Sequence, residues 1–154
     1  MKLIERETFY ICGYAVETTA ARNDNDVSAL YKDFFDTDKE TVLLQLTGSK
    51  KGYYGLSWYT QGHEKYCYLL GIEVGKENKP PENALLKEVT KTVYAVGCYP
   101  DGKDVIEAWN ELFYTDIPNG GYSPNEQFNL YFEYYPEDVK RAFELWVPVV
   151  KTDA

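Results

Sequence analysis

A single carboxylate lies in the most aromatic stretch of the sequence, QFNLYFEYYPED, residues 127–138. Side chains alternate between the two faces of a strand, so Glu133 would share one face with Tyr131 and Tyr135. Burial of an unpaired carboxylate is costly and usually raises its pKa. An organic cation would restore the ionised form, and each ring would add roughly 0.5–2 kcal/mol of cation–π attraction. Two interpretations stay open: Glu133 faces solvent, or it is held among rings to receive a cation.

Glu144, in FELWVPV, is the second candidate acid. If the last two predicted strands form a hairpin, Glu144 and Glu133 could face the same side of the sheet. Two neighbouring carboxylates push one pKa upward, which suits either a dication site or a hydrolase with one acid and one base. The alternative is a surface Glu144 paired with Lys140 or Arg141.

Aromatic residues supply the candidate pocket walls, since the chain contains 15 Tyr, 7 Phe and 3 Trp. We expect Trp58 and Tyr68 to lie in facing strands of one hairpin and Trp146 to close the other. Trp109 is expected on the inner face of a helix, where core packing competes with a ligand role. The candidate ligand-binding residues are Glu133, Trp58, Tyr68, Trp146, Tyr131, Tyr135, Trp109, Glu144 and Tyr54.

Motifs for metal, nucleotide or nucleophilic chemistry are missing from the sequence. Cys12, Cys67 and Cys98 are far apart and lie in apolar runs, which predicts free buried thiols in a reducing compartment. The single histidine, His63, lies in the polar turn QGHE, and no Ser-His-Asp arrangement can be built around it. We therefore expect no metal and no cofactor, and no catalytic residue can be assigned.

The charge balance also restricts the possible partners. A net charge of −9 without a Lys/Arg stripe disfavours nucleic acid, whereas it attracts cations or basic proteins, or serves solubility alone. The N-terminus lacks an apolar signal region and no run approaches membrane-spanning length. These features predict a cytoplasmic protein with no membrane partner.

Periodicity predicts the same order of elements in each half of the chain. Helix 23–35 would bury Val27, Leu30, Tyr31 and Phe34, and helix 104–113 would place Val105, Ile106, Trp109, Leu112 and Phe113 on one face. The predicted strands are 7–18, 53–60, 65–74, 86–99, 128–135 and 143–150.

Both halves are thus predicted to have the element order β-α-β-β. We expect one domain over 1–154, with a first repeat at about 7–74, a linker at 75–85 and a second repeat at about 86–151. The predicted fold is α+β, with an antiparallel sheet, two helices packed on one side and a pseudo-two-fold axis between the repeats. The cleft between the repeats is the expected place for a pocket.

The order of several short motifs resembles the GyrI-like effector-binding domain family, which includes drug-binding domains of multidrug-responsive regulators and stand-alone homologues. The matching pieces run from Phe9 to Lys151 and are YCYLLGIEV, VTKTVYAV, IEAWNELF, IPNGGY, YFEYYPED and ELWVPV. The resemblance implies a pocket for hydrophobic, often cationic or aromatic, small molecules, with Glu133 as the buried acid. No helix-turn-helix precedes Phe9, so direct gene regulation is not expected.

The resemblance leaves three functions open. The favoured one is a stand-alone protein that binds a lipophilic, cationic or aromatic compound. The second is a hydrolase of reactive cyclopropane-type compounds that uses Glu133 or Glu144 as acid or base. The third is an acidic protein that docks on a basic partner such as gyrase, which only the net charge of −9 supports.

Overall fold

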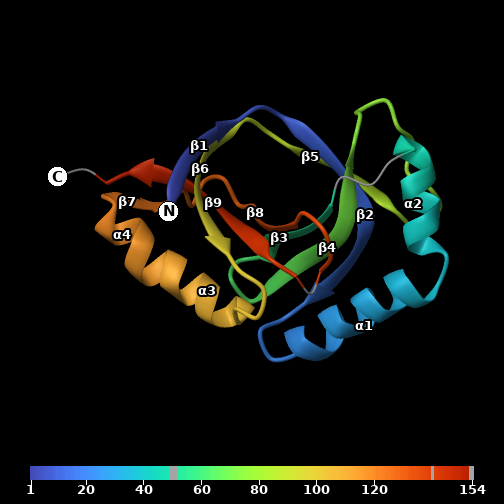
Figure 1. The fold of residues 1–154 in the computed structure, drawn as a ribbon, viewed down its shortest axis with the longest axis horizontal. Coiled ribbons are helices and arrows are strands. Elements are labelled where there is room, and N and C mark those ends of the chain that lie inside the picture. Colours follow the sequence, from blue (N-terminus) through green and yellow to red (C-terminus); the bar gives the residue numbers. More distant parts are fainter. Residues whose placement is uncertain (49–51, 140, 153–154) are drawn as a thin grey trace.

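The computed structural model describes residues 1–48, 52–139 and 141–152, and its core is one antiparallel sheet (Figure 1). The sheet contains nine strands in the order β1-β6-β9-β8-β3-β4-β2-β5, with β7 paired to β9. The strands are β1 (Lys2–Arg6), β2 (Phe9–Thr18), β3 (Tyr53–Gln61), β4 (Lys65–Val74), β5 (Leu85–Val89), β6 (Thr92–Tyr99), β7 (Tyr122–Pro124), β8 (Tyr131–Tyr135) and β9 (Phe143–Lys151). The helical segments are α1 (Asn23–Asp36), α2 (Lys39–Thr47), α3 (Val105–Glu111), the π-helical turn η1 (Leu112–Asp116) and α4 (Ile117–Asn119).

The strand order is symmetric about the β3–β8 pair. On one side it runs β8-β9-β6, and on the other it runs β3-β4-β2. Each half therefore places its last strand between its first and second, as a duplicated unit related by a pseudo-two-fold axis would. The predicted α+β class with an antiparallel sheet is confirmed. The exact repeat boundaries stay a prediction, which this symmetry supports.

The two end strands are exchanged between the halves. β1 precedes β2 in the chain but pairs with β6, and β5 precedes β6 but pairs with β2. Only residues 7–8 and 90–91 make these two crossings, so opposite ends of the sheet must come close together. Figure 1 shows β1 and β5 arching over the side of the sheet that faces away from α1 and α3. The Lys91 backbone N–H donates to Thr8 Oγ1 at 3.1 Å, which joins the two crossings.

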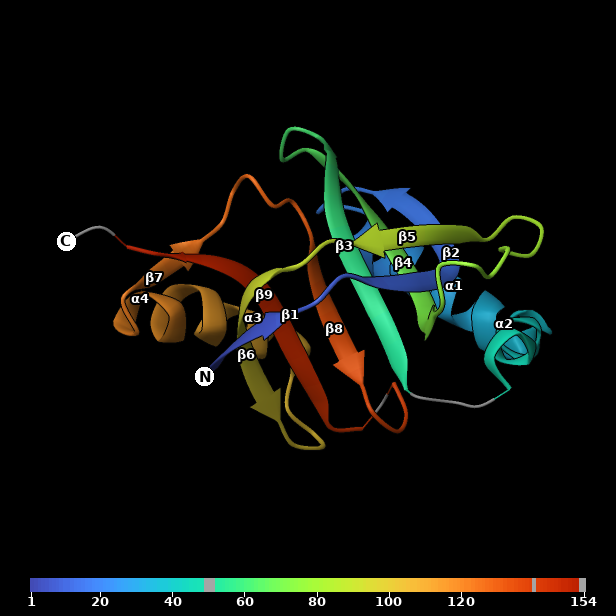
Figure 2. The same ribbon diagram turned by 90° about the horizontal axis from the view of Figure 1, so that it is seen from above.

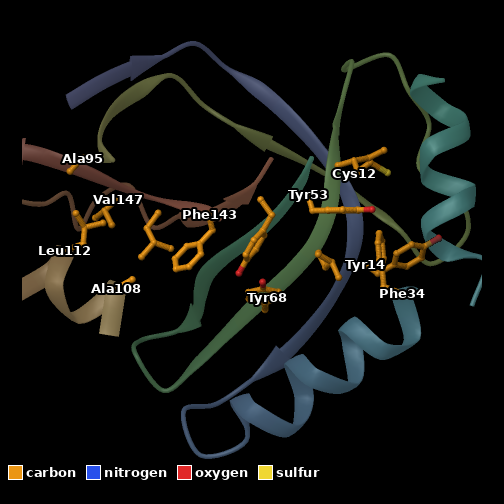
Figure 3. Close-up of a cluster of buried hydrophobic side chains, with 14 of the residues drawn as sticks. Cys12, Tyr14, Phe34, Tyr53, Tyr68, Ala95, Ala108, Leu112, Phe143 and Val147 are labelled. Atoms are coloured by element: carbon orange, nitrogen blue, oxygen red, sulfur yellow. The ribbon is translucent and has the colours of Figure 1, made fainter. Parts of the chain in front are cut away.

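The curled sheet buries a different apolar cluster on each face. The helix-side cluster packs Phe34, Leu43, Ala108 and Leu112 against strand residues such as Leu145 (Figure 3). The cluster inside the curl contains no helix residue; its members include Ile11, Leu56, Tyr94, Phe132 and Trp146. Figure 2 shows α1 and α2 beside one half of the sheet, and α3 and α4 beside the other. The helices thus lie on one face, with the centre of the sheet between them.

Several predicted elements differ from the structure. The predicted strand 86–99 is divided into β5 and β6, and strand 128–135 is ordered as a strand only from Tyr131. Strands β1 and β7 and helix α2 were not predicted from the sequence. These elements are short or lack a clear period: α2 carries three of its four apolar residues in the contiguous run 42–44, and its C-cap is Gly48, which adopts a φ of 71°. Contiguous apolar residues do not distinguish a helix from a strand.

The predicted helix faces are correct except at one position. Phe34 is fully buried, and Val27, Leu30 and Tyr31 pack on the helix-side cluster. Ile106 is 64% exposed, so it lies at the solvent-exposed edge of the predicted face and is not part of the buried core. Residues 105, 109 and 112 already fill that face, and position 106 turns about 100° away from its neighbour at 105.

Candidate ligand-binding site

Glu133 lies at the centre of the sheet, on the face that the helices cover. It pairs across the β8–β3 ladder with Gly55. A Cβ atom at Gly55 would lie 2.1 Å from the Tyr68 hydroxyl and 2.9 Å from Glu133 Oε1. The glycine therefore leaves the space in which the Tyr68 hydroxyl and the carboxylate meet.

Three side chains donate hydrogen bonds to the Glu133 carboxylate. The hydroxyls of Tyr68 and Tyr135 donate to Oε1 at 2.8 and 3.1 Å. The Trp109 indole Nε1–H donates to Oε2 at 3.2 Å. The Tyr31 hydroxyl lies 2.5 Å from that of Tyr68 and extends the network. Strands β4 and β8 and helices α1 and α3 all contribute, so the site exists only when both halves are folded together.

The electrostatics of this network leave Glu133 without a counter-charge. Burial raises the pKa of Glu133 above its ordinary value of 4.5, and the hydrogen bonds from Tyr68, Trp109 and Tyr135 partly oppose that rise. Burial also raises the pKa of Tyr68 well above its ordinary value, and the neighbouring charge of Glu133 raises it further. The tyrosines are therefore neutral donors at pH 7. Among the described residues, no Lys or Arg forms a salt bridge with Glu133.

A cavity of about 500 Å³ opens over this carboxylate, between α1 and α3. Its floor is formed by β3, β4 and β8. Aromatic side chains dominate its lining, with several polar and aliphatic residues between them. The lining residues are Asn23, Asp24, Val27, Tyr31, Ser57, Trp58, Tyr59, Tyr66, Tyr68, Val105, Ile106, Trp109, Phe113, Tyr131, Glu133 and Tyr135.

Six of the nine candidate residues line this cavity: Glu133, Tyr68, Tyr131, Tyr135, Trp109 and Trp58. The Trp58 side chain also packs on the cluster inside the curl, and Lys87 Nζ lies 4.4 Å from its ring centroid. Trp58 and Tyr68 lie in the facing strands β3 and β4, as predicted, but their side chains point to opposite faces of the sheet. Ser57 lies opposite Tyr68 in the register, and Trp58 lies opposite Cys67.

Glu144, Tyr54 and Trp146 belong to the other face of the sheet. Glu133 pairs with Leu145, whereas Glu144 pairs with Tyr134, so the predicted shared face of the two carboxylates is wrong. The hairpin prediction placed the two strands side by side but could not fix their register, and a shift by one residue changes the face. The two-carboxylate acid–base pair of the hydrolase alternative is therefore not formed.

Local contacts occupy these three side chains. The Trp146 ring stacks on Phe132 at 5.2 Å between centroids, and its indole N–H donates to Glu144 Oε1 at 3.0 Å. Tyr54 donates from its hydroxyl to Glu73 at 3.1 Å. Arg141, proposed as a partner of Glu144, lies 3.6 Å from Asp101 instead. Lys140 lies outside the described residues.

Several lining residues were not among the candidates. Tyr31, which extends the carboxylate network, was predicted only as a core residue of its helix. Tyr66 precedes Tyr68 by two positions and so shares its face, a signal that strand alternation offers. Phe113 follows Trp109 by four positions on the second helix and was likewise predicted to face inward. Tyr59 and Asp24 carry no comparable signal in the sequence.

The described ranges contain no group of three or more His, Cys, Asp or Glu side chains able to hold a metal ion. None of their helices is long and apolar enough to cross a membrane.

A family model described as Cass2, integron-associated effector binding protein, matches residues 2–149. A comparison with curated proteins gave no match.

Similar solved structures share the fold over nearly the whole chain. SAV2435 bound to tetraphenylphosphonium is 15% identical with a TM-score of 0.76, over 97% of this chain and 93% of its own. The integron cassette protein VCH_CASS2 of Vibrio cholerae is 18% identical with a TM-score of 0.71, over 97% and 95%. The EcmrR C-terminal domain is 12% identical with a TM-score of 0.64, over 98% and 97%.

Proposed function

The chain belongs to the Cass2 family of integron-associated effector-binding proteins, and from this premise we propose that its effector is a lipophilic organic cation bound over Glu133. The family membership confirms the resemblance to GyrI-like effector-binding domains and makes the chain an effector-binding protein. The cationic character of the effector and its contact residues are the parts that we propose.

The observation that carries the proposal is the unpaired Glu133 carboxylate in an aromatic cavity. Its hydrogen bonds from Tyr68, Tyr135 and Trp109 orient both oxygens but supply no positive charge. A bound cation would supply that charge in a medium of low dielectric constant, where the attraction is much stronger than in water. A neutral ligand of the same shape would leave the carboxylate as it is in the free protein.

The rings of the cavity favour a delocalised cation over a compact ammonium ion. Aromatic faces attract cations within about 6 Å of the ring centroid. A delocalised cation also loses less hydration energy when it leaves water. SAV2435, which shares this fold, was solved with such an ion, tetraphenylphosphonium. That observation concerns SAV2435 alone. It is the reason for using tetraphenylphosphonium as the probe in the experiment on this chain.

The test is a titration with tetraphenylphosphonium followed by tryptophan fluorescence, because the Trp109 indole contacts the carboxylate directly. We expect saturable binding by the wild type and at least about tenfold weaker binding by Glu133→Gln, a difference of about 1.4 kcal/mol. The matched control is Glu144→Gln, which removes one carboxylate from the opposite face of the same sheet. This control should bind like the wild type.

A neutral probe separates charge from hydrophobicity. Triphenylphosphine oxide carries similar rings without the positive charge, so its binding should be weak and insensitive to Glu133→Gln. Equal loss of affinity in Glu144→Gln and Glu133→Gln would contradict the proposal. So would equal affinity of the wild type and Glu133→Gln for tetraphenylphosphonium.

A further inference from the structure

The cavity contains a second carboxylate that the contacts around Glu133 do not involve. Asp24 lies in the first turn of α1 and lines the cavity at its exposed rim. Among the described residues Asp24 forms no salt bridge, and the cavity lining includes no Lys, Arg or His. In a chain with 16 Lys and Arg residues, this cavity therefore holds two acids and no base.

Two tyrosines of β4 give a scale for the separation of these acids. The Tyr68 hydroxyl donates to Glu133, and the Tyr66 hydroxyl donates to the side chain of Asn23, the neighbour of Asp24. Tyr66 and Tyr68 are two positions apart on one strand, a separation of roughly 7 Å. The two carboxylates thus lie at different depths of the same cavity, on the order of 7–10 Å apart.

Rings occupy the space between the two depths. Tyr59 lies 6.3 Å from Tyr66 and 6.3 Å from Tyr131, measured between ring centroids, and all three line the cavity. Burial raises the pKa of Tyr66, and the negative charges of Glu133 and Asp24 are among the further causes. Both carboxylates therefore act on the same hydroxyl. An apolar spacer would lie along these rings while its two ends approach the two acids.

We propose that the cavity selects dications, whose two positive centres are held roughly 7–10 Å apart by a rigid apolar spacer, and that Asp24 is the residue that sets this preference. The inference rests on the proposed function, because Glu133 must hold the first positive centre. Asp24 is exposed, so salt and water screen its attraction and its effect is a moderate one. It should add several-fold to the affinity for a dication and little to that for a monocation.

The test compares p-xylylenebis(trimethylammonium) with benzyltrimethylammonium by calorimetry at low ionic strength. A symmetric dication gains a statistical factor of two, so the wild type should prefer it by about fivefold or more. In Asp24→Asn this preference should fall to about the statistical factor, with the affinity for the monocation unchanged. Asp36→Asn is the matched control, since it removes an exposed acid from the same helix outside the cavity.

The Glu133→Gln variant distinguishes failure of the dication inference from failure of the proposed function. If it weakens both probes while the wild type shows no preference beyond the statistical factor, the dication inference is overturned and the cation site stands. The dication inference is also overturned if the preference for the dication persists in Asp24→Asn or is lost equally in Asp36→Asn. If Glu133→Gln binds both probes as the wild type does, the proposed function fails together with the inference. If neither probe binds while tetraphenylphosphonium does, the dication inference is overturned and the cation site stands.

Discussion

The surroundings of Glu133 combine several features that the proposed cation site requires. The residue opposite it is Gly55, which leaves room for the Tyr68 hydroxyl to reach the carboxylate. Tyrosine suits this place because its hydroxyl donates to the acid while its ring forms part of the wall. Tyr68 and Tyr135, with Tyr31 bonded in turn to Tyr68, thus hold the acid in position without neutralising it.

The raised pKa of Glu133 makes cation binding depend on pH. Burial raises this pKa above 4.5, so the free protein binds a proton at a pH where an ordinary carboxyl is ionised. A cation prefers the ionised form, so the affinity for a monocation should rise with pH above about 4.5 and level off above the raised pKa. Binding at a pH within that window should release a proton. Calorimetry in buffers of different ionisation enthalpy measures that release.

The control for this prediction is Glu133→Gln, which has no carboxyl to titrate at that position. Its affinity for tetraphenylphosphonium should be low and nearly constant over the same pH range. A pH dependence of equal size in Glu133→Gln would assign the titration to another group.

At the scale of elements, β1 accounts for the candidate aromatic residues that do not line the cavity. Its last residue, Arg6, places its guanidinium inside the curl, 3.6 Å from the Phe9 ring centroid and within 5.7 Å of the rings of Tyr54, Phe132 and Trp146. Arg6 also pairs with Glu73 at 3.1 Å. These aromatic residues therefore surround a cation, but that cation belongs to the chain itself.

Loss of Arg6 should loosen the exchanged strand. The Arg6 side chain is only 21% exposed, and it joins β1 to rings of β3, β8 and β9 and to Glu73 of β4. We expect Arg6→Ala to lower the free energy of unfolding by about 2 kcal/mol, through the lost cation–π contacts and the unpaired Glu73. Urea denaturation measures this change.

Arg22→Ala provides the comparison, since its side chain is 75% exposed and its pair with Asp26 spans 3.6 Å. The expected cost there is less than about 0.5 kcal/mol. Arg6→Lys should recover only part of the loss, because an ammonium ion lacks the planar face that stacks on rings. Equal stability of Arg6→Ala and Arg22→Ala would show that the contacts of Arg6 with the surrounding rings and Glu73 contribute little.

At the scale of the whole molecule, the two faces of the sheet differ: one carries the cavity and the other a closed apolar core. The helix-side face holds the cavity at the junction of the two halves, and the face inside the curl is closed by β1 and β5. Because each end strand pairs with the other half, neither half completes its share of the sheet alone. This exchange fixes the two halves, and hence Tyr31 and Trp109 on either side of Glu133, in one arrangement.

The net charge of −9 should act on the rate at which a cation arrives. Long-range attraction steers a cation toward the protein and is screened by salt, whereas contacts inside the cavity are screened much less. The association rate of tetraphenylphosphonium should fall several-fold between about 0.02 and 0.5 M salt, with the dissociation rate changing less than about twofold. Stopped-flow fluorescence separates the two rates. The association rate of triphenylphosphine oxide, which is neutral, should not depend on salt. A change confined to the dissociation rate of tetraphenylphosphonium would contradict this prediction.

Much of this protein follows from its sequence because strand and helix periods report which side chains share a face. Alternation alone placed Glu133 with Tyr131 and Tyr135 and apart from Phe132, and repetition of the element order predicted the cleft between two halves. Helical spacing likewise placed Trp109 and Tyr31 on inner faces. These are local properties, and neighbouring residues determine them.

The tertiary structure decided what depends on register and on contacts between distant segments. One residue of register put Glu144 opposite Tyr134 and so on the face away from Glu133. Exchange of β1 brought Arg6 to Tyr54 and Trp146, more than forty residues away in the chain, and so turned two candidate ligand residues into partners of an internal cation. The pairing of strands and the crossing of chain segments are set by the free energy of the whole fold, and no local period encodes them.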